Sequence, residues 1–109
     1  MNNFKLSVFK KAALCRNFEN ETFKKIEQKI IQIPVYLSAG QEYISATIAT
    51  LLEKKVKPHI FIQHRGHSIY LSFNGDPIKL IDELLGRESG CANGMGGSAS
   101  IQSKERRLR

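Results

Sequence analysis

The stretch Gln63-His64-Arg65-Gly66-His67 carries two imidazoles and one guanidinium within five residues. Apolar residues lie on both sides of it, at 60–62 and 69–71, and we expect 59–62 to be extended. Binding sites are often built in this way, where a polar loop joins two elements of a scaffold. The Arg65 guanidinium can hold a phosphate or carboxylate through two parallel hydrogen bonds, and an imidazole can carry protons near neutral pH. The stretch therefore predicts an anion-binding turn.

The composition is that of one small globular domain. The 109 residues are 41% hydrophobic and 25% charged, and the formal net charge is +7. Such a charge suits nucleic acid, a membrane surface or an anionic ligand. Lysines spread over several segments are also ordinary on solvated helix faces, and we favour that interpretation. Residues 104–109 read as a basic tail without a core-forming pattern.

The cysteines and the N-terminus indicate the compartment. Cys15 and Cys91 stand far apart and outside any CxxC pairing, so one disulfide is possible but has no support. The sequence shows no secretory signal and no apolar run of about 18 residues, which a membrane span requires. We therefore expect a cytoplasmic protein that does not cross a membrane.

Hydrophobic periodicity predicts helices along most of the chain. Apolar residues recur every three or four positions over 4–31, and Pro34 ends that helix. Asn20 is either the cap of a second helix or an exposed residue within one. Further helices are expected at 67–73 and 77–85. The ends of the last one are marked by residues that favour helix termini, namely Asp76, Pro77 and Gly86.

The segment 39–54 is predicted to be a largely buried helix. Ser38 is a suitable N-cap, and Gln41 three residues later completes a capping-box pattern. An apolar stripe begins at Ile44, and small residues fill the other positions, so the helix can approach its neighbours closely. Because this helix and 77–85 are apolar enough to expect a partner, we predict an aggregation-prone monomer.

The segment 87–103 differs in character, with glycines at 90, 94, 96 and 97. Glycines let backbone N–H groups come close to a ligand or a neighbouring chain. The segment lacks the Lys-Ser/Thr pair of a P-loop and the GxGxxG spacing of a dinucleotide site. From local chemistry we favour a mobile surface loop.

Three other kinds of site were weighed against an anion-binding turn. A zinc site would have to use all three histidines, His59, His64 and His67, without nearby cysteine ligands, and we do not favour it. A nucleophilic pair of Cys91 with a histidine stays open, because such pairs are assembled in space. RNA binding through Arg65, the lysines and Tyr70 fits the charge, but no RNP-like or helix-turn-helix pattern supports it.

Three motifs, read in order, point to a family. They are Leu37-Ser38-Ala39-Gly40-Gln41-Glu42, then His64-Arg65-Gly66-His67, then Gly86-Arg87 with Gly90-Cys91 and Gly94-Met95-Gly96-Gly97-Ser98. Their order and separations resemble the alpha subunit of thiamin-diphosphate-dependent 2-oxo-acid dehydrogenases, which includes pyruvate, branched-chain 2-oxo-acid and acetoin dehydrogenases. Arg16 with Phe18-Glu19 is similar to the arginine-phenylalanine-glutamate segment of that family. The resemblance covers almost the whole chain.

The resemblance implies an α/β thiamin-diphosphate-binding fold, of which residues 1–109 would be the helical N-terminal portion, with most of the sheet missing. It implies an oxidoreductase that decarboxylates a 2-oxo acid, or cleaves acetoin, and passes the acyl group to a lipoyl arm. The implied cofactor is thiamin diphosphate with Mg²⁺. The implied partners are a beta subunit and a lipoyl-bearing acyltransferase, and neither nucleic acid nor a membrane is expected.

The resemblance also assigns roles to individual residues. His64 and Arg65 match the pair that contacts the cofactor diphosphate, and His67 matches an active-site histidine. Tyr36 occupies the position of a substrate-contacting histidine. The Gly-Asp-Gly segment that holds Mg²⁺ in the family is absent, since Gly75-Asp76 is followed by proline, so no metal ligand is assigned. We therefore expect a truncated reading frame or fragment that is inactive alone.

Overall fold

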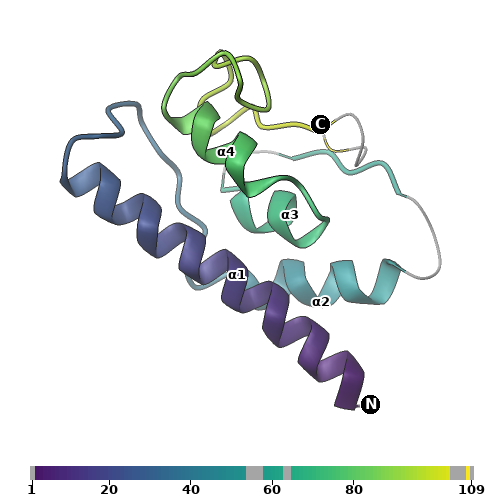
Figure 1. Ribbon diagram of the computed structural model, residues 1–109. Coiled ribbons are helices and arrows are strands. Elements are labelled where there is room, and N and C mark those ends of the chain that lie inside the picture. Colours follow the sequence, from purple (N-terminus) through teal and green to yellow (C-terminus); the bar gives the residue numbers. More distant parts are fainter. Residues whose placement is uncertain (1, 54–57, 63–64, 104–107, 109) are drawn as a thin grey trace.

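The computed structural model describes residues 2–53, 58–62, 65–103 and 108. These residues form four helices, α1 (Asn2–Glu27), α2 (Glu42–Leu52), α3 (His67–Ser72) and α4 (Pro77–Leu84) (Figure 1). Extended pairing within the described part of the chain is confined to two isolated bridges, Ile60 with Leu108 and Ser103 with Leu108. The segment 59–62 therefore forms no strand. The helical character agrees with the prediction for an N-terminal portion.

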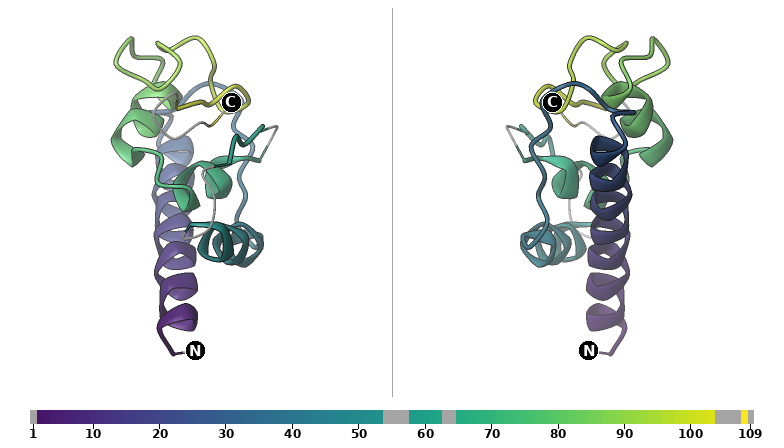
Figure 2. Two further views of the ribbon diagram at one scale, coloured as in Figure 1. Left: turned by 90° about the vertical axis from the view of Figure 1, so that its right-hand side faces the viewer. Right: turned by 90° about the vertical axis from the view of Figure 1, so that its left-hand side faces the viewer.

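Helix α1 is the longest of the four helices that the structure describes. Helices α2 and α3 pack against it and against each other. Figure 2 shows the first turns of α1 projecting beyond the other elements, while the segment after α4 gathers at the opposite end. Within the described ranges, no helix has the length and hydropathy to cross a bilayer.

The core lies where α1, α3 and α4 meet the C-terminal segment. Its members are Cys15, Tyr70, Leu71, Leu80, Ile101 and Leu108. A smaller cluster joins α1 to α2 through Val8, Ala12 and Ala46. Leu108 is buried, although the tail 104–109 shows no core-forming pattern in the sequence. The other tail residues lie outside the described ranges.

Helix ends follow the sequence where the signal is local. The Asp76 carboxylate accepts a hydrogen bond from the Ile78 N–H at 2.9 Å, and Gly86 takes a φ of +75° just after α4, as predicted. Helix α1 runs through Asn20, which is exposed within it. It stops before the predicted residue 31, since Lys29 adopts a φ of +60°, which breaks helical geometry.

Two predictions for the helix at 39–54 are wrong. Gln41 is the N-cap of α2, and Ser38 makes hydrogen bonds elsewhere. The helix is also not largely buried, because Ile44, Ile48 and Leu51 are 66%, 47% and 52% exposed. The small residues Ser45, Ala46 and Ala49 face the protein instead. Their size lets α2 lie close to α1, so the apolar stripe is turned outward.

Candidate functional site

Four side chains from separate segments meet in one buried cluster, which we call the polar junction: Glu19, Ser38, His67 and Ser98. Glu19 comes from the middle of α1, and His67 is the first residue of α3. Ser38 precedes α2. Ser98 lies after α4 in residues 87–103, which we call the glycine-rich segment. All four are at most 3% exposed. Sequence positions from 19 to 98 are thus brought together at a single point.

A continuous path of hydrogen bonds runs through the polar junction from Tyr36 to Glu19. The Tyr36 N–H donates to Ser98 Oγ at 3.0 Å, and Ser98 Oγ lies 2.9 Å from His67 Nε2. On the other side of the ring, His67 Nδ1 lies 2.7 Å from Glu19 Oε1. An ionised carboxylate can only accept, which places a proton on Nδ1, and Nε2 shares a hydrogen bond with the Ser98 hydroxyl. Both imidazole nitrogens are therefore occupied within the chain.

The second oxygen of Glu19 holds the chain that leads into α2. The Ser38 N–H donates to Glu19 Oε2 at 2.6 Å. The Ser38 hydroxyl accepts from the Ser68 N–H at 3.3 Å, which ties this segment to the start of α3. The Phe18 ring meets the His67 ring edge-on, with centroids 6.1 Å apart. These contacts fix the imidazole plane from a third side.

An ion pair next to the polar junction fixes the start of α2. The Arg16 guanidinium donates two hydrogen bonds of 3.0 Å to the Glu42 carboxylate. The Gly40 N–H also donates to Glu42, at 2.6 Å, from a turn in which Gly40 has a φ of +94°. The hydrogen bonds from Arg16 hold the pKa of Glu42 below its usual value. Arg16 and Glu42 both belong to the motifs on which the resemblance rests.

The glycine-rich segment folds around a buried carboxylate, that of Glu83 on α4. Four backbone N–H groups donate to it, from Ala92 at 2.5 Å, Gly94 at 3.0 Å, Gly96 at 2.8 Å and Gly97 at 3.2 Å. Glu83 is 0% exposed. The segment 87–103 is a loop at the surface, as predicted, but it closes around this buried carboxylate, and its mobility stays a prediction. Its N–H groups do approach an anion, but the anion is part of the same chain.

The residues predicted for the site fall at different depths. His67 lies inside the polar junction and is fully buried. Tyr36 is 40% exposed, and its backbone bonds Ser98, so it lies beside the junction. Arg65 is exposed immediately before α3 and has a φ of +61°, which is uncommon for a residue with a side chain. His64 lies outside the described residues.

Two of the competing sites, the zinc site and the Cys91–histidine pair, can be compared with the described residues. No group of three or more histidine, cysteine, aspartate or glutamate side chains there is arranged to hold a metal ion. Cys15 and Cys91 are both free thiols, and no hydrogen bond joins either to a described histidine. Burial raises the pKa of both thiols, which lowers the thiolate fraction at neutral pH.

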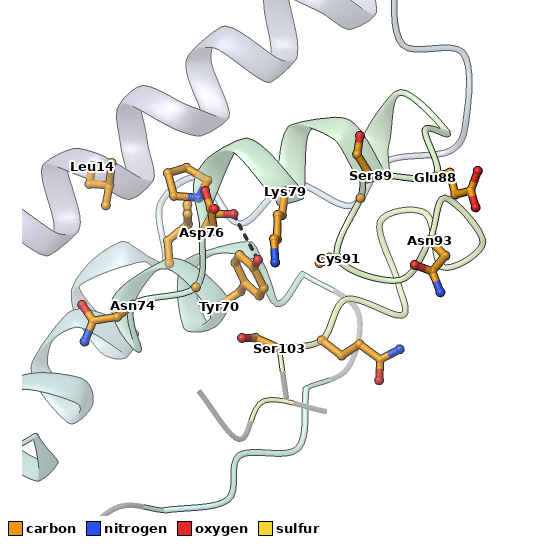
Figure 3. Close-up of a pocket in the computed structure, with 15 residues that line it drawn as sticks. Leu14, Tyr70, Asn74, Asp76, Lys79, Glu88, Ser89, Cys91, Asn93 and Ser103 are labelled. Carbon is orange, nitrogen blue, oxygen red and sulfur yellow. Dashed lines mark hydrogen bonds between the residues drawn. The ribbon is translucent and has the colours of Figure 1, made fainter. Parts of the chain in front are cut away.

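A cavity of about 740 Å³ lies between α3, α4 and the C-terminal segment (Figure 3). Lys79 extends from α4 into the space between Tyr70 and Cys91. The Tyr70 hydroxyl donates to the Asp76 carbonyl at 3.0 Å. None of the polar-junction residues lines this cavity. Gly90 and Cys91 of the third motif do line it. We place the candidate site at the junction and at Arg65, because the residue roles that the resemblance assigns fall there.

Sequence reasoning missed the part that Glu83 plays. One signal was available: Glu83 lies between Leu80 and Leu84 on the face of α4 that is buried. A carboxylate on an apolar helix face needs donors, and the glycines that follow are a source of free N–H groups. Glu19 and Ser98 entered the sequence analysis only as members of motifs, without a role.

Comparison with known proteins adds an independent finding. A family model described as "Dehydrogenase E1 component" matches residues 10–109. The mitochondrial pyruvate dehydrogenase E1 component subunit alpha-1 of Arabidopsis thaliana is 32% identical over 100 residues, which is 92% of this chain and 25% of that protein. The alpha subunit of acetoin:2,6-dichlorophenolindophenol oxidoreductase from Cupriavidus necator is 31% identical over 96 residues, 88% of this chain and 28% of that protein.

A third relative is similar to the same extent. The pyruvate dehydrogenase E1 component subunit alpha of Porphyra purpurea is 32% identical over 98 residues, which is 90% of this chain and 28% of that protein. The chain thus spans about a quarter of the length of the curated relatives that it matches. No solved structure gives a significant match.

Proposed function

Because the chain belongs to the dehydrogenase E1 component family, we propose that it is an alpha-type component of a thiamin-diphosphate-dependent 2-oxo-acid or acetoin dehydrogenase. Within this proposal, residues 1–109 supply the helical N-terminal portion of an α/β cofactor-binding fold. The activity of the whole assembly is the oxidative decarboxylation of a 2-oxo acid, or acetoin cleavage, with acyl transfer to lipoyl groups. A beta subunit and a lipoyl-bearing acyltransferase are its proposed partners.

One observation carries the proposal: the motif residues, far apart in sequence, meet in space. Glu19, Ser38, His67 and Ser98 form one hydrogen-bonded cluster, and Arg16 and Glu42 pair beside it. A chance likeness of short motifs would not be expected to bring them together. The resemblance of the motifs therefore has a physical basis in the folded chain.

Arg65 fits the diphosphate of thiamin diphosphate, whereas the glycine-rich segment does not. Arg65 is exposed, and its guanidinium has no ion-pair partner in the described part of the chain, so it is available to grip a diphosphate through two hydrogen bonds. The N–H groups of the glycine-rich segment are not available, since Glu83 occupies them. In the proposal, His64 joins Arg65 at the diphosphate. Mg²⁺ would need ligands other than these.

When bound, thiamin diphosphate supplies a thiazolium carbon that attacks an oxo group and accepts the electrons released by decarboxylation. The contribution of this chain is to bind and orient. Arg65 would offset part of the diphosphate charge, and the proposal places Tyr36 on the substrate side, beside the junction. His67 is aligned by Glu19 at Nδ1, which leaves Nε2 as the nitrogen that can exchange a proton with a substrate once Ser98 moves away.

The same geometry supports the proposal that the chain alone is inactive. Both nitrogens of His67 are engaged and the ring is 0% exposed, so neither can meet a substrate in this structure. Release of Nε2 would require the glycine-rich segment to shift. The expected cytoplasmic location stays a prediction, and the Arabidopsis relative is named as a mitochondrial protein.

The role of Arg65 can be tested by NMR titration of the 109-residue chain with thiamin diphosphate and Mg²⁺. We expect weak, millimolar binding that shifts the Arg65 side-chain signal, and no shift with thiamin, which lacks the diphosphate. Arg65→Ala should weaken binding at least about tenfold, because a hydrogen bond to a charged group contributes about 1.5–3 kcal/mol. Arg87→Ala removes an exposed arginine that pairs with Asp82, and it should leave binding unchanged.

Two results would count against this assignment. Micromolar binding by the chain alone would overturn the proposed inactivity. Equal effects of the two arginine substitutions on thiamin diphosphate binding would show general charge attraction in place of a site at Arg65. The alternative function is a small basic module for RNA. That alternative is favoured only by the net charge of +7. It predicts salt-dependent binding of generic RNA that is lost on Arg65→Ala and on removal of residues 104–109.

A further inference from the structure

We propose that Glu83 is a positioning residue: an internal anion that shapes the glycine-rich segment and thereby holds Ser98 against Nε2 of His67. The proposal deepens the proposed function, and it rests on that function only in giving the imidazole a part in the reaction. The arrangement itself stands on the hydrogen bonds of this chain. Glu83 belongs to none of the motifs that carry the family resemblance.

The first support is the number and direction of the donors around Glu83. Oε1 accepts from the N–H groups of Ala92 and Gly94, and Oε2 accepts from those of Gly96 and Gly97. Backbone N–H groups that converge on one point form a concave site of the kind that binds a phosphate or another anion. Here a side chain from α4 fills the site. The Glu83 carboxylate therefore orders the segment as a bound anion would.

The second support is that the segment wraps closely enough to require glycine. A Cβ added at Gly90 would lie 2.6 Å from Glu83 Cα and 2.7 Å from Glu83 Oε1, which real side chains do not tolerate. Gly97 has a φ of +59° and donates to Glu83 from the position next to Ser98. The close approach of Glu83 thus explains the glycine at position 90, whereas Cβ atoms added at Gly94 and Gly96 would meet the backbone oxygens of Arg87 and Ser100.

The third support is the short path from Glu83 to the imidazole. Gly97 N–H is held by Glu83 Oε2, and the next residue, Ser98, places Oγ 2.9 Å from His67 Nε2. Glu19 holds the opposite nitrogen, Nδ1, at 2.7 Å. Two buried carboxylates therefore act on the two edges of one ring. Glu19 acts directly, and Glu83 acts through the backbone of the glycine-rich segment.

Removing the charge of Glu83 while keeping the shape of its side chain should disorder the glycine-rich segment and release Ser98 from His67. In Glu83→Gln, one acceptor oxygen becomes an NH₂ group that faces N–H donors, so at least one pair of amides loses its acceptor. We expect these amides to exchange at least about tenfold faster with solvent, and Ser98 to leave Nε2. The matched control is Glu88→Gln, an exposed glutamate in the same segment, which should change neither property.

The deciding measurement is the side-chain ¹⁵N spectrum of His67 in the folded chain, with amide exchange at 92, 94, 96 and 97 alongside it. A positioning role predicts that the Nε2 signal of Glu83→Gln moves toward that of Ser98→Ala, which lacks the hydroxyl. A merely structural role would lower the melting temperature and leave the Nε2 signal of the folded chain where it was. That second result would overturn the proposal.

A further measurement covers the case in which Glu83→Gln does not fold. In the unsubstituted chain, through-hydrogen-bond couplings should join the Glu83 carboxyl carbon to the four amide nitrogens. Absence of these couplings, together with unprotected amides, would overturn the proposal. Failure of thiamin diphosphate to bind the unsubstituted chain would count against the proposed function alone, because the couplings and the His67 spectrum are read without cofactor.

Discussion

Helix α2 separates two regions of opposite chemistry. Toward the protein it borders the polar junction, whose four buried members are all hydrogen-bonded. Toward solvent it carries what we call the outer face of α2: Tyr43, Ile44, Ile48 and Leu51, each at least 47% exposed. Polar groups are therefore inside and large apolar groups outside, on either side of one short helix.

The two regions differ in whether their side chains already have partners within the chain. A buried polar group costs free energy unless it finds a hydrogen-bond partner, and the chain supplies partners for every member of the polar junction. A contiguous apolar surface is costly in water until another surface covers it, and such patches mark interaction sites. The polar junction is thus complete within the chain, whereas the outer face of α2 is a surface on which we expect association.

The largest expected effect comes from removing the carboxylate at the centre of the polar junction. Glu19→Ala leaves the Ser38 N–H and His67 Nδ1 buried without an acceptor. At about 1–3 kcal/mol for each unsatisfied donor, the loss of stability is about 2–6 kcal/mol. Urea denaturation followed by far-UV circular dichroism measures it. If the pairing of the junction mattered little, the loss would stay below about 1 kcal/mol.

Thr22 offers the matched control on the same helix. It lies three residues after Glu19 and is fully buried, but its hydroxyl has no hydrogen-bond partner among the described residues. Thr22→Val removes that hydroxyl and keeps the shape, so we expect stability to be unchanged or to rise by about 1 kcal/mol. A loss as large as that of Glu19→Ala would mean that burial of the position, and not pairing, decides the cost.

The outer face of α2 predicts an effect on association. Ile44→Lys places a charge at its centre and should weaken self-association at least about tenfold, or about 1.4 kcal/mol. Sedimentation velocity over a range of concentrations measures this. Met95→Lys is the control, since Met95 lies outside both apolar helices, is 90% exposed and gains the same charge. Equal effects of the two substitutions would show that net charge, and not the outer face of α2, governs association.

The sequence predicted best what local chemistry decides. The start of α4 depends on Asp76 and Pro77, which act on the backbone next to them, and the prediction there is confirmed. The family membership that three ordered motifs indicated is confirmed as well. His67 was singled out because an imidazole is rare and chemically distinct. Its role in catalysis stays a prediction, as do those of His64, Arg65 and Tyr36.

What the sequence did not predict depends on contacts between distant residues. Ser38 has the right spacing for an N-cap, but its hydroxyl donates to the Glu19 carboxylate and accepts from the Ser68 N–H instead. The stripe on α2 was correctly found, yet periodicity does not say which side faces the protein. Glu83 has no motif of its own, because its role exists only once the segment 92–97 has closed around it.

The smallest expected effect lies at the edge of the polar junction, where Glu42 meets Arg16, whose side chain is half exposed. Arg16 holds the pKa of Glu42 below its usual value, so folding favours the ionised form. This stabilisation is complete above the unfolded pKa of about 4.3 and is lost as the pH falls through the lower folded value. The stability difference between the unsubstituted chain and Glu42→Gln should therefore be constant from neutral pH to about pH 5 and shrink below about pH 4. Urea denaturation at several pH values tests this, with Glu21→Gln as the exposed control. A difference that stays constant or grows in acid would show that the carboxylate is not stabilised by the guanidinium.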